Sequence, residues 1–242
     1  MTRHSAGRPR ALRRSPCSFG AKPAETELRD GWNVVLRYES EDGHAGREDG
    51  HPRREGGDPA RGDGHPGAGP RLVDLSHRRR WDFQDSGVAD LRPMGLPVPE
   101  GFGDVGVHDG LVITRMNRTQ VAIWHLGATP APDMPAESGF TEVTDGHCML
   151  AFVGDGVSEV LEHLTALDLF DPARDMPFLT QGPVLHVPCQ VVTFARDVVV
   201  MTLARGYGET FAEAALASGG IAGLRPGGER LFTQVFERAF SG

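Results

Sequence analysis

Histidine and cysteine stand side by side at His147-Cys148, and this pairing of a base with a thiol is the first candidate for a nucleophilic site. Residues 149–153 form a continuous apolar run, as expected of a strand that is buried on both faces. A thiol beside or inside such a strand behaves as a small apolar group and is inert. Cys189 follows Pro188 in a more open loop position but has no base near it in the sequence. We therefore predict that neither cysteine is catalytic.

Metal ligands are the second possibility, because Asp-Gly-His recurs at residues 42–44, 49–51 and 63–65. These histidines could form a weak metal site, or they could belong to a low-complexity tail. The tail is favoured, since a metal site needs ligands held in fixed geometry and the surrounding glycines hold nothing. The patterns H-E-x-x-H, C-x-x-C and G-x-S-x-G do not occur in the sequence. We predict no metal site and no catalytic set in this chain.

A glycine-rich turn at residues 154–156 could in principle bind a dinucleotide cofactor. Gly154-Asp155-Gly156 follows the apolar run and precedes a helical pattern, as in a dinucleotide-binding turn. That fingerprint needs a third small residue three positions after the second glycine, where this chain has Glu159. A second match at residues 101–106 lies in a Pro/Gly loop before a strand-like run. We therefore expect this chain to bind neither NAD nor FAD.

Charge and hydropathy exclude further classes of function. The 242 residues carry a formal net charge of −8, with +1 in residues 1–70 and −9 in residues 71–242. An acidic folded part argues against a nucleic-acid surface. The sequence has no long uncharged apolar run, so we expect no membrane span. Arg13-Arg14 is not followed by the apolar region of an export signal, and we expect a cytoplasmic protein.

Three arginines, at residues 78–80, stand beside Trp81 and could bind phosphate. The alternative is a solvated turn, which is the commoner role for such a cluster. We favour the turn, because one basic cluster in an acidic domain is weak evidence for an anion site.

The elements that must position these residues begin near Leu72. Residues 1–70 are poor in aliphatic and aromatic side chains and are predicted to be a disordered tail, with Trp32–Tyr38 as a possible isolated strand. Residues 71–242 are predicted to form one domain. The expected strands are residues 72–75, 105–108, 111–116, 120–126, 149–153, 184–187 and 190–194 around Pro188, and 198–203.

Helices are expected between and after these strands. A short helix should follow Ser86, and a longer one should run from an N-cap at Asp155 to Leu167. Thr210 and Glu213 form a capping box for a helix that ends near Ser218. An apolar stripe over residues 231–240 predicts a terminal helix that packs in the core or docks another subunit. The order of elements predicts an α+β, ferredoxin-like domain with helices on one face of a mainly antiparallel sheet.

Several segments resemble the glycine-cleavage aminomethyltransferase superfamily. Residues 72–78 read L-V-D-L-S-H-R, like a segment of those folate-binding proteins, and residues 144–169 resemble their strand–glycine–helix core. The loop G-L-P-V-P at residues 95–99 and the pattern from Arg205 to Leu216 are similar to the gamma subunits of heterotetrameric sarcosine oxidases. The resemblance covers residues 71 to about 220.

The resemblance implies a gamma-type subunit that carries no cofactor and has no active site of its own. It would pack against large flavoprotein subunits, of alpha or beta type, that hold FAD, FMN and NAD. Their complex would demethylate sarcosine, or another N-methyl amino acid, to glycine and pass the one-carbon unit to tetrahydrofolate.

The resemblance also leaves open a stand-alone folate-dependent aminomethyltransferase or methyltransferase, related to the T-protein of glycine cleavage. In that case Asp74, Glu142 or Asp145 would hold the pterin or steer the iminium carbon. A carboxylate can accept pterin N–H bonds and stabilise positive charge. A third possibility is an interaction domain of unrelated ancestry.

Overall fold

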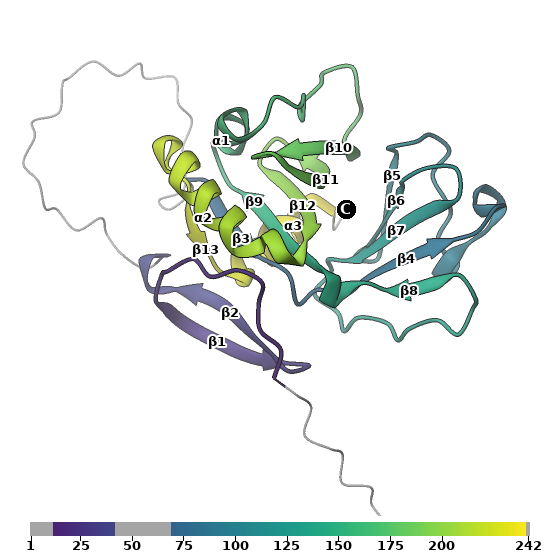
Figure 1. The fold of residues 1–242 in the computed structure, drawn as a ribbon, viewed down its shortest axis with the longest axis horizontal. Helices are drawn as coiled ribbons and strands as arrows, with labels where there is room; N and C mark the ends of the chain where they lie inside the picture. Colours follow the sequence, from purple (N-terminus) through teal and green to yellow (C-terminus); the bar gives the residue numbers. More distant parts are fainter. Residues whose placement is uncertain (1–11, 42–68, 241–242) are drawn as a thin grey trace, which may run out of the picture.

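A central antiparallel sheet organises the chain in the computed structural model, which describes residues 12–41 and 69–240 (Figure 1). The sheet has six strands in the order β10, β11, β12, β9, β3 and β13, and only the pairing of β13 with β3 is parallel. The strands are β10 (Phe178–Val184), β11 (Val187–Ala195), β12 (Val198–Ala204), β9 (His147–Val153), β3 (Arg71–Asp74) and β13 (Arg225–Gly227). The α+β class and the mainly antiparallel sheet are as predicted.

Strand β9 lies inside this sheet, and its six residues from Cys148 to Val153 are buried, as their apolar run predicts. Because successive side chains point to opposite faces, β9 contributes to two cores. Leu150 and Phe152 face α1 (Val157–Leu164) and α2 (Gly208–Gly219). Met149 and Ala151 face α3 (Glu229–Phe240) on the other side. The expectation that the helices share one face therefore holds for α1 and α2 but not for α3.

A second sheet lies to the right in Figure 1 and is antiparallel throughout. Its five strands are β5 (Val105–His108), β6 (Leu111–Arg115), β7 (Gln120–His125), β4 (Arg80–Gln84) and β8 (Phe140–Glu142), in that order across the sheet. One face shares the core of α3 and the central sheet through Val112 and Trp124. The other face packs its own cluster around Trp81 and Leu96.

The N-terminal part of the chain is ordered where the structure describes it, so the prediction of a disordered tail is wrong for residues 12–41. Strands β1 (Pro23–Arg29) and β2 (Trp32–Tyr38) form a hairpin around Asp30-Gly31, whose φ values are +47° and +87°. Composition suggested disorder because apolar residues are few, but Trp32, Val34 and Tyr38 are all buried. The Asp-Gly-His repeats lie outside the described residues.

The hairpin is held against the start of α3. Glu41 Oε1 accepts hydrogen bonds from the backbone N–H groups of Tyr38 and Gly228, each at 2.8 Å. A Cβ atom at Gly228 would collide with the carbonyl oxygen of Leu36, so glycine is required for this close approach. The chain's few N-terminal apolar residues are therefore stabilised by tertiary contacts rather than by local sequence.

Several boundaries differ from the sequence-based predictions. Helix α1 is preceded by Gly156 at φ +85° instead of an Asp155 cap, and it ends at Leu164. Helix α2 begins at Gly208, so Thr210 lies inside it and forms no capping box. The strand expected at residues 184–187 instead contains a turn, because Leu185 and His186 adopt positive φ values and reverse the chain between β10 and β11. The strand expected at residues 190–194 lies within β11.

Short 3₁₀ turns complete the fold. The helix expected after Ser86 is one such turn, at Val88–Asp90. The others are Glu39–Glu41, Pro93–Gly95, Thr144–Gly146, Arg205–Tyr207 and Gly220–Ala222. Among the described residues, the longest helices have 12 residues, and none is long and apolar enough to cross a membrane.

Candidate functional site

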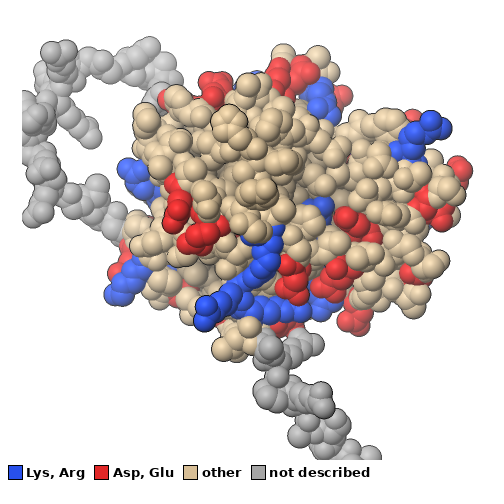
Figure 2. Space-filling view, viewed as in Figure 1, with Lys and Arg blue, Asp and Glu red and all other residues tan. Residues whose placement is uncertain are grey.

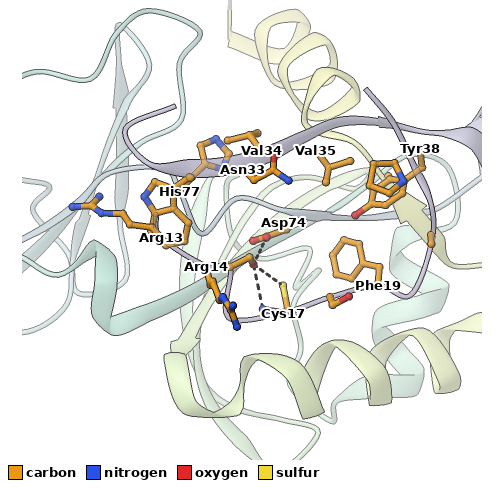
Figure 3. A pocket seen from close by; sticks show the side chains of 16 residues that line it. Arg13, Arg14, Cys17, Phe19, Asn33, Val34, Val35, Tyr38, Asp74 and His77 are labelled. Atoms are coloured by element: carbon orange, nitrogen blue, oxygen red, sulfur yellow. Dashed lines mark hydrogen bonds between the residues drawn. The ribbon is translucent and has the colours of Figure 1, made fainter. Parts of the chain in front are cut away.

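A cavity of about 370 Å³ lies between the N-terminal segment, β2 and the end of β3 (Figure 3). Its volume is in the range of small-molecule sites. Polar side chains and aromatic rings share the lining. The polar and aromatic residues that line it include Arg13, Arg14, Ser15, Phe19, Trp32, Asn33, Tyr38, Asp74 and His77. We call it the Asp74 cavity.

Asp74 is the last residue of β3, and its carboxylate lies in the middle of the cavity in Figure 3. Oδ1 accepts the backbone N–H of Ser76 at 2.9 Å, and Oδ2 accepts the hydroxyl of Ser15. Each carboxylate oxygen can accept two hydrogen bonds, so Asp74 retains some capacity for a ligand. The hydroxyl of Ser15, from the segment before β1, nevertheless occupies one of these acceptor positions.

Aromatic rings line the cavity around Asp74. The ring centroids of Phe19 and Tyr38 are 6.1 Å apart. Burial, followed by the charge of Asp74, raises the pKa of the Tyr38 phenol, which therefore stays protonated at neutral pH. The guanidinium groups of Arg13 and Arg205 lie 5.8 and 5.6 Å from the Trp32 ring centroid. A carboxylate, a phenol and flanking cations suit a small polar ligand with a planar group.

The structure does not bring Glu142 and Asp145 into the Asp74 cavity. Asp145 has a side chain 61% exposed and lies 3.5 Å from Nη2 of Arg13, which lines the cavity. Glu142 ends β8, accepts the Thr144 hydroxyl at 3.2 Å and lies 4.0 Å from Arg79. Of the three predicted pterin ligands, Asp74 is the one that lines this cavity.

The three cysteines are free and buried. Cys148 is fully buried, as predicted, and Cys189 is 5% exposed, which corrects the expectation of a more open position. A hydrogen bond with Cys148 and burial raise the pKa of Cys17 far above its ordinary value, while burial raises the pKa of Cys189 to about 11. His147 Nδ1 lies 3.0 Å from the carbonyl oxygen of Val143, to which it can donate. The thiols of Cys17 and Cys189 are therefore poor nucleophiles at neutral pH.

The arginine cluster is not a solvated turn, because Arg78 and Arg80 are 7% and 1% exposed. Arg80 donates to Gln190 Oε1 at 2.6 Å and to the Thr202 hydroxyl, and desolvation by burial lowers its pKa to about 10. Arg78 pairs with Glu229 at 2.6 Å. The prediction failed because Gln190, Thr202 and Glu229 are more than a hundred residues away from these arginines in the chain.

Sequence reasoning missed Glu229, the first residue of α3. Its side chain is 2% exposed and also lies 2.8 Å from His77 Nε2 and 2.5 Å from Arg29 Nη1. Burial raises the pKa of this carboxyl, but the hydrogen bond to His77 and the charges of His77, Arg78 and Arg29 outweigh it and lower the pKa to about 2. An acidic residue at a helix start is the sole local signal, and it also fits an ordinary helix terminus.

The chain resembles known proteins in its structure but not in its sequence. No family model and no curated protein sequence matches the chain. A chain of the heterotetrameric sarcosine oxidase from Corynebacterium sp. U-96, in complex with pyrrole 2-carboxylate, superposes with a TM-score of 0.53 at 12% identity, over 63% of this chain and 85% of that one. The glycine cleavage system aminomethyltransferase T from Bartonella henselae gives a TM-score of 0.51 at 16% identity and covers 93% of this chain.

The chain has an aminomethyltransferase-like fold. It spans 61% of the length of the Bartonella aminomethyltransferase chain. At identities this low the likeness establishes the fold, and the reaction must be argued from the chain's own residues.

Proposed function

We propose that this chain is a gamma-type accessory subunit of a heterotetrameric sarcosine, or N-methyl amino acid, oxidase, and that it has no reaction centre of its own. The observation that carries the proposal is that the chain's own residues already donate hydrogen bonds to the Asp74 carboxylate. The donors are Ser15 and Ser76, and residues 13–15 line the same cavity. The Ser15 hydroxyl therefore occupies one acceptor position that a pterin would use. Occupation of the site by the chain itself favours a supporting role over catalysis.

The proposed partners are the large flavoprotein subunits, which would hold FAD, FMN and NAD and deliver the one-carbon unit to tetrahydrofolate. Figure 2 shows a broad area around α2 with few charged side chains. Near the two ends of this helix, Tyr207 and Ile221 are 54% and 85% exposed. Exposed apolar side chains beside an area with few charges are typical of a protein–protein contact, so we propose that a large subunit contacts the chain there.

The alternative is a stand-alone folate-dependent aminomethyltransferase, and the Asp74 cavity is the specific observation in its favour. The carboxylate, the Phe19 and Tyr38 rings and the cations at Arg13 and Arg14 could bind the pterin and the acidic tail of tetrahydrofolate. The two functions differ in one measurable property, which is tight binding of tetrahydrofolate by the chain alone.

Co-expression with the large flavoprotein subunits is expected to give a stable complex that copurifies and oxidises sarcosine. The chain alone is expected to show no turnover and no micromolar binding of tetrahydrofolate in calorimetry. If the chain alone does bind, and Asp74→Asn weakens binding by about 10- to 100-fold, the aminomethyltransferase is supported instead, since losing a hydrogen bond to a charged group costs about 1.5–3 kcal/mol. Asp90→Asn, at an exposed position that does not line the cavity, is the matched control.

A further inference from the structure

A second cavity, of about 620 Å³, lies between the turn of the β1–β2 hairpin, the connection from β3 to β4, the end of β7 and the start of α3. It is lined by Glu27, Arg29, Asp30, His77, Arg78, Arg79, His125, Glu229, Thr233 and the loop at residues 128–131. We propose that this cavity binds a small monocarboxylate through Arg79 and His125. The proposal does not depend on the role of the Asp74 cavity or on the function proposed above.

His125 is the last residue of β7 and is 4% exposed, yet its Nε2 has no hydrogen-bond partner within the part of the chain that the structure describes. A buried polar atom left unpaired costs about 1–3 kcal/mol, so it calls for a partner. Burial, together with the charges of Arg78, Arg79 and His77, lowers the pKa of His125 to about 4. The ring is therefore neutral at pH 7, and its Nε2–H tautomer can donate to an anion without carrying charge itself.

Arg79 stands opposite His125. The backbone N–H of His125 donates to the carbonyl oxygen of Arg79 at 2.9 Å, which continues the β4–β7 register by one residue beyond Arg80 and Trp124. Residues directly opposite each other in an antiparallel pair project from the same face. Both side chains line the cavity, so a ligand there can reach the guanidinium and the imidazole together.

The Arg79 guanidinium is also weakly engaged. Its nearest carboxylate oxygens belong to Asp30, at 3.9 Å, and to Glu142, at 4.0 Å, and both distances exceed hydrogen-bond length. The side chain is 27% exposed. A planar guanidinium fork fits the two oxygens of a carboxylate, which Arg79 does not obtain from these acidic neighbours.

The other charges around the cavity are largely satisfied by one another. Arg29 directs Nε and Nη2 to Glu27 at 2.9 and 2.7 Å, and Nη1 to Glu229. Glu229 is also bonded by His77 and Arg78. A dianion such as phosphate would meet repulsion from Glu27, Asp30 and Glu229, whereas a single negative charge gains the attraction of Arg79 at lower cost. This balance favours a monocarboxylate over phosphate.

The test uses the full chain and sodium acetate as the probe, with sodium chloride at equal ionic strength as the reference. Nuclear magnetic resonance of the histidine rings, with His125 assigned by His125→Gln, is expected to show a saturable shift at millimolar acetate. The pKa of His125 is expected to rise by about one unit or more with acetate bound, because an opposite charge within a few ångströms favours the protonated ring. Arg79→Gln is expected to weaken acetate binding about tenfold or more.

Arg92→Gln is the matched control, because Arg92 is exposed and does not line the cavity. It should leave the acetate titration unchanged. Thermal unfolding of Arg79→Gln establishes that the variant is folded before its titration is compared. The proposal is overturned if acetate produces no saturable shift at His125 up to about 100 mM, or if folded Arg79→Gln responds as the wild type does. Tighter binding of phosphate than of acetate would refute the carboxylate assignment.

Discussion

Glu229→Gln is expected to lower the free energy of unfolding by about 3–5 kcal/mol, as is typical when one partner of a buried ion pair is removed. The wild-type carboxylate is 2% exposed and meets Arg29, His77 and Arg78 within 2.8 Å. An amide removes the negative charge and leaves the guanidinium groups of Arg29 and Arg78 without their shared buried carboxylate. Chemical denaturation of the wild type and the variant at pH 7 measures the difference.

The Glu229 carboxyl also makes the free energy of unfolding depend on pH. Its pKa in the folded state is about 2, against an ordinary value of 4.5, so the unfolded chain binds a proton more readily than the folded chain between these pH values. The contribution of Glu229 is therefore complete above about pH 4.5 and is lost as the pH falls toward 2. The difference in stability between wild type and Glu229→Gln should shrink over this interval.

Glu25→Gln is the matched control for both measurements. Glu25 also links β1 to α3, through Arg230 at 2.6 Å, but the two side chains are 39% and 49% exposed. An exposed ion pair is worth about 0–1 kcal/mol. A loss below about 1 kcal/mol in Glu229→Gln, equal to that of Glu25→Gln, would contradict a role for the buried cluster in stability.

Phe232→Ala is expected to destabilise the protein by about 3–5 kcal/mol, because it opens a cavity where α3 packs on the central sheet. Phe232 is fully buried, and its ring stacks on Phe236 at a centroid distance of 5.4 Å. Differential scanning calorimetry should show a lower melting temperature with a single transition. A change of a few tenths of a kcal/mol would mean that α3 is not part of the core.

Phe102→Ala provides the comparison, since this ring is 61% exposed and contacts the Arg115 guanidinium at 5.2 Å. Its loss is expected to change stability by about 0.5 kcal/mol or less. Burial of Phe232 and Phe236 against the sheet already places that part of the terminal apolar stripe in the core.

Local pattern predicted the elements whose signal lies within one segment. The apolar run of β9, the stripe of α1 and the strand at Val105–His108 follow from residue spacing alone, because period two and period 3.6 reflect burial of one face. Strand β10 escaped prediction because Phe178–Val184 contains Gly182 and Pro183, which weaken a strand pattern. Strand β4 was missed because the pattern around Arg80 was interpreted as a turn.

By itself the sequence determined the α+β class and the buried central strand, since both depend on neighbouring residues. Tertiary structure alone decided that the β1–β2 hairpin packs on the domain and that Ser15 donates a hydrogen bond to Asp74. It also decided that Arg29, His77 and Arg78 surround the Glu229 carboxylate. Arg29 and His77 are 200 and 152 residues from Glu229 in the chain. Contacts over such separations form when the sheets and α3 assemble, and no local periodicity records them.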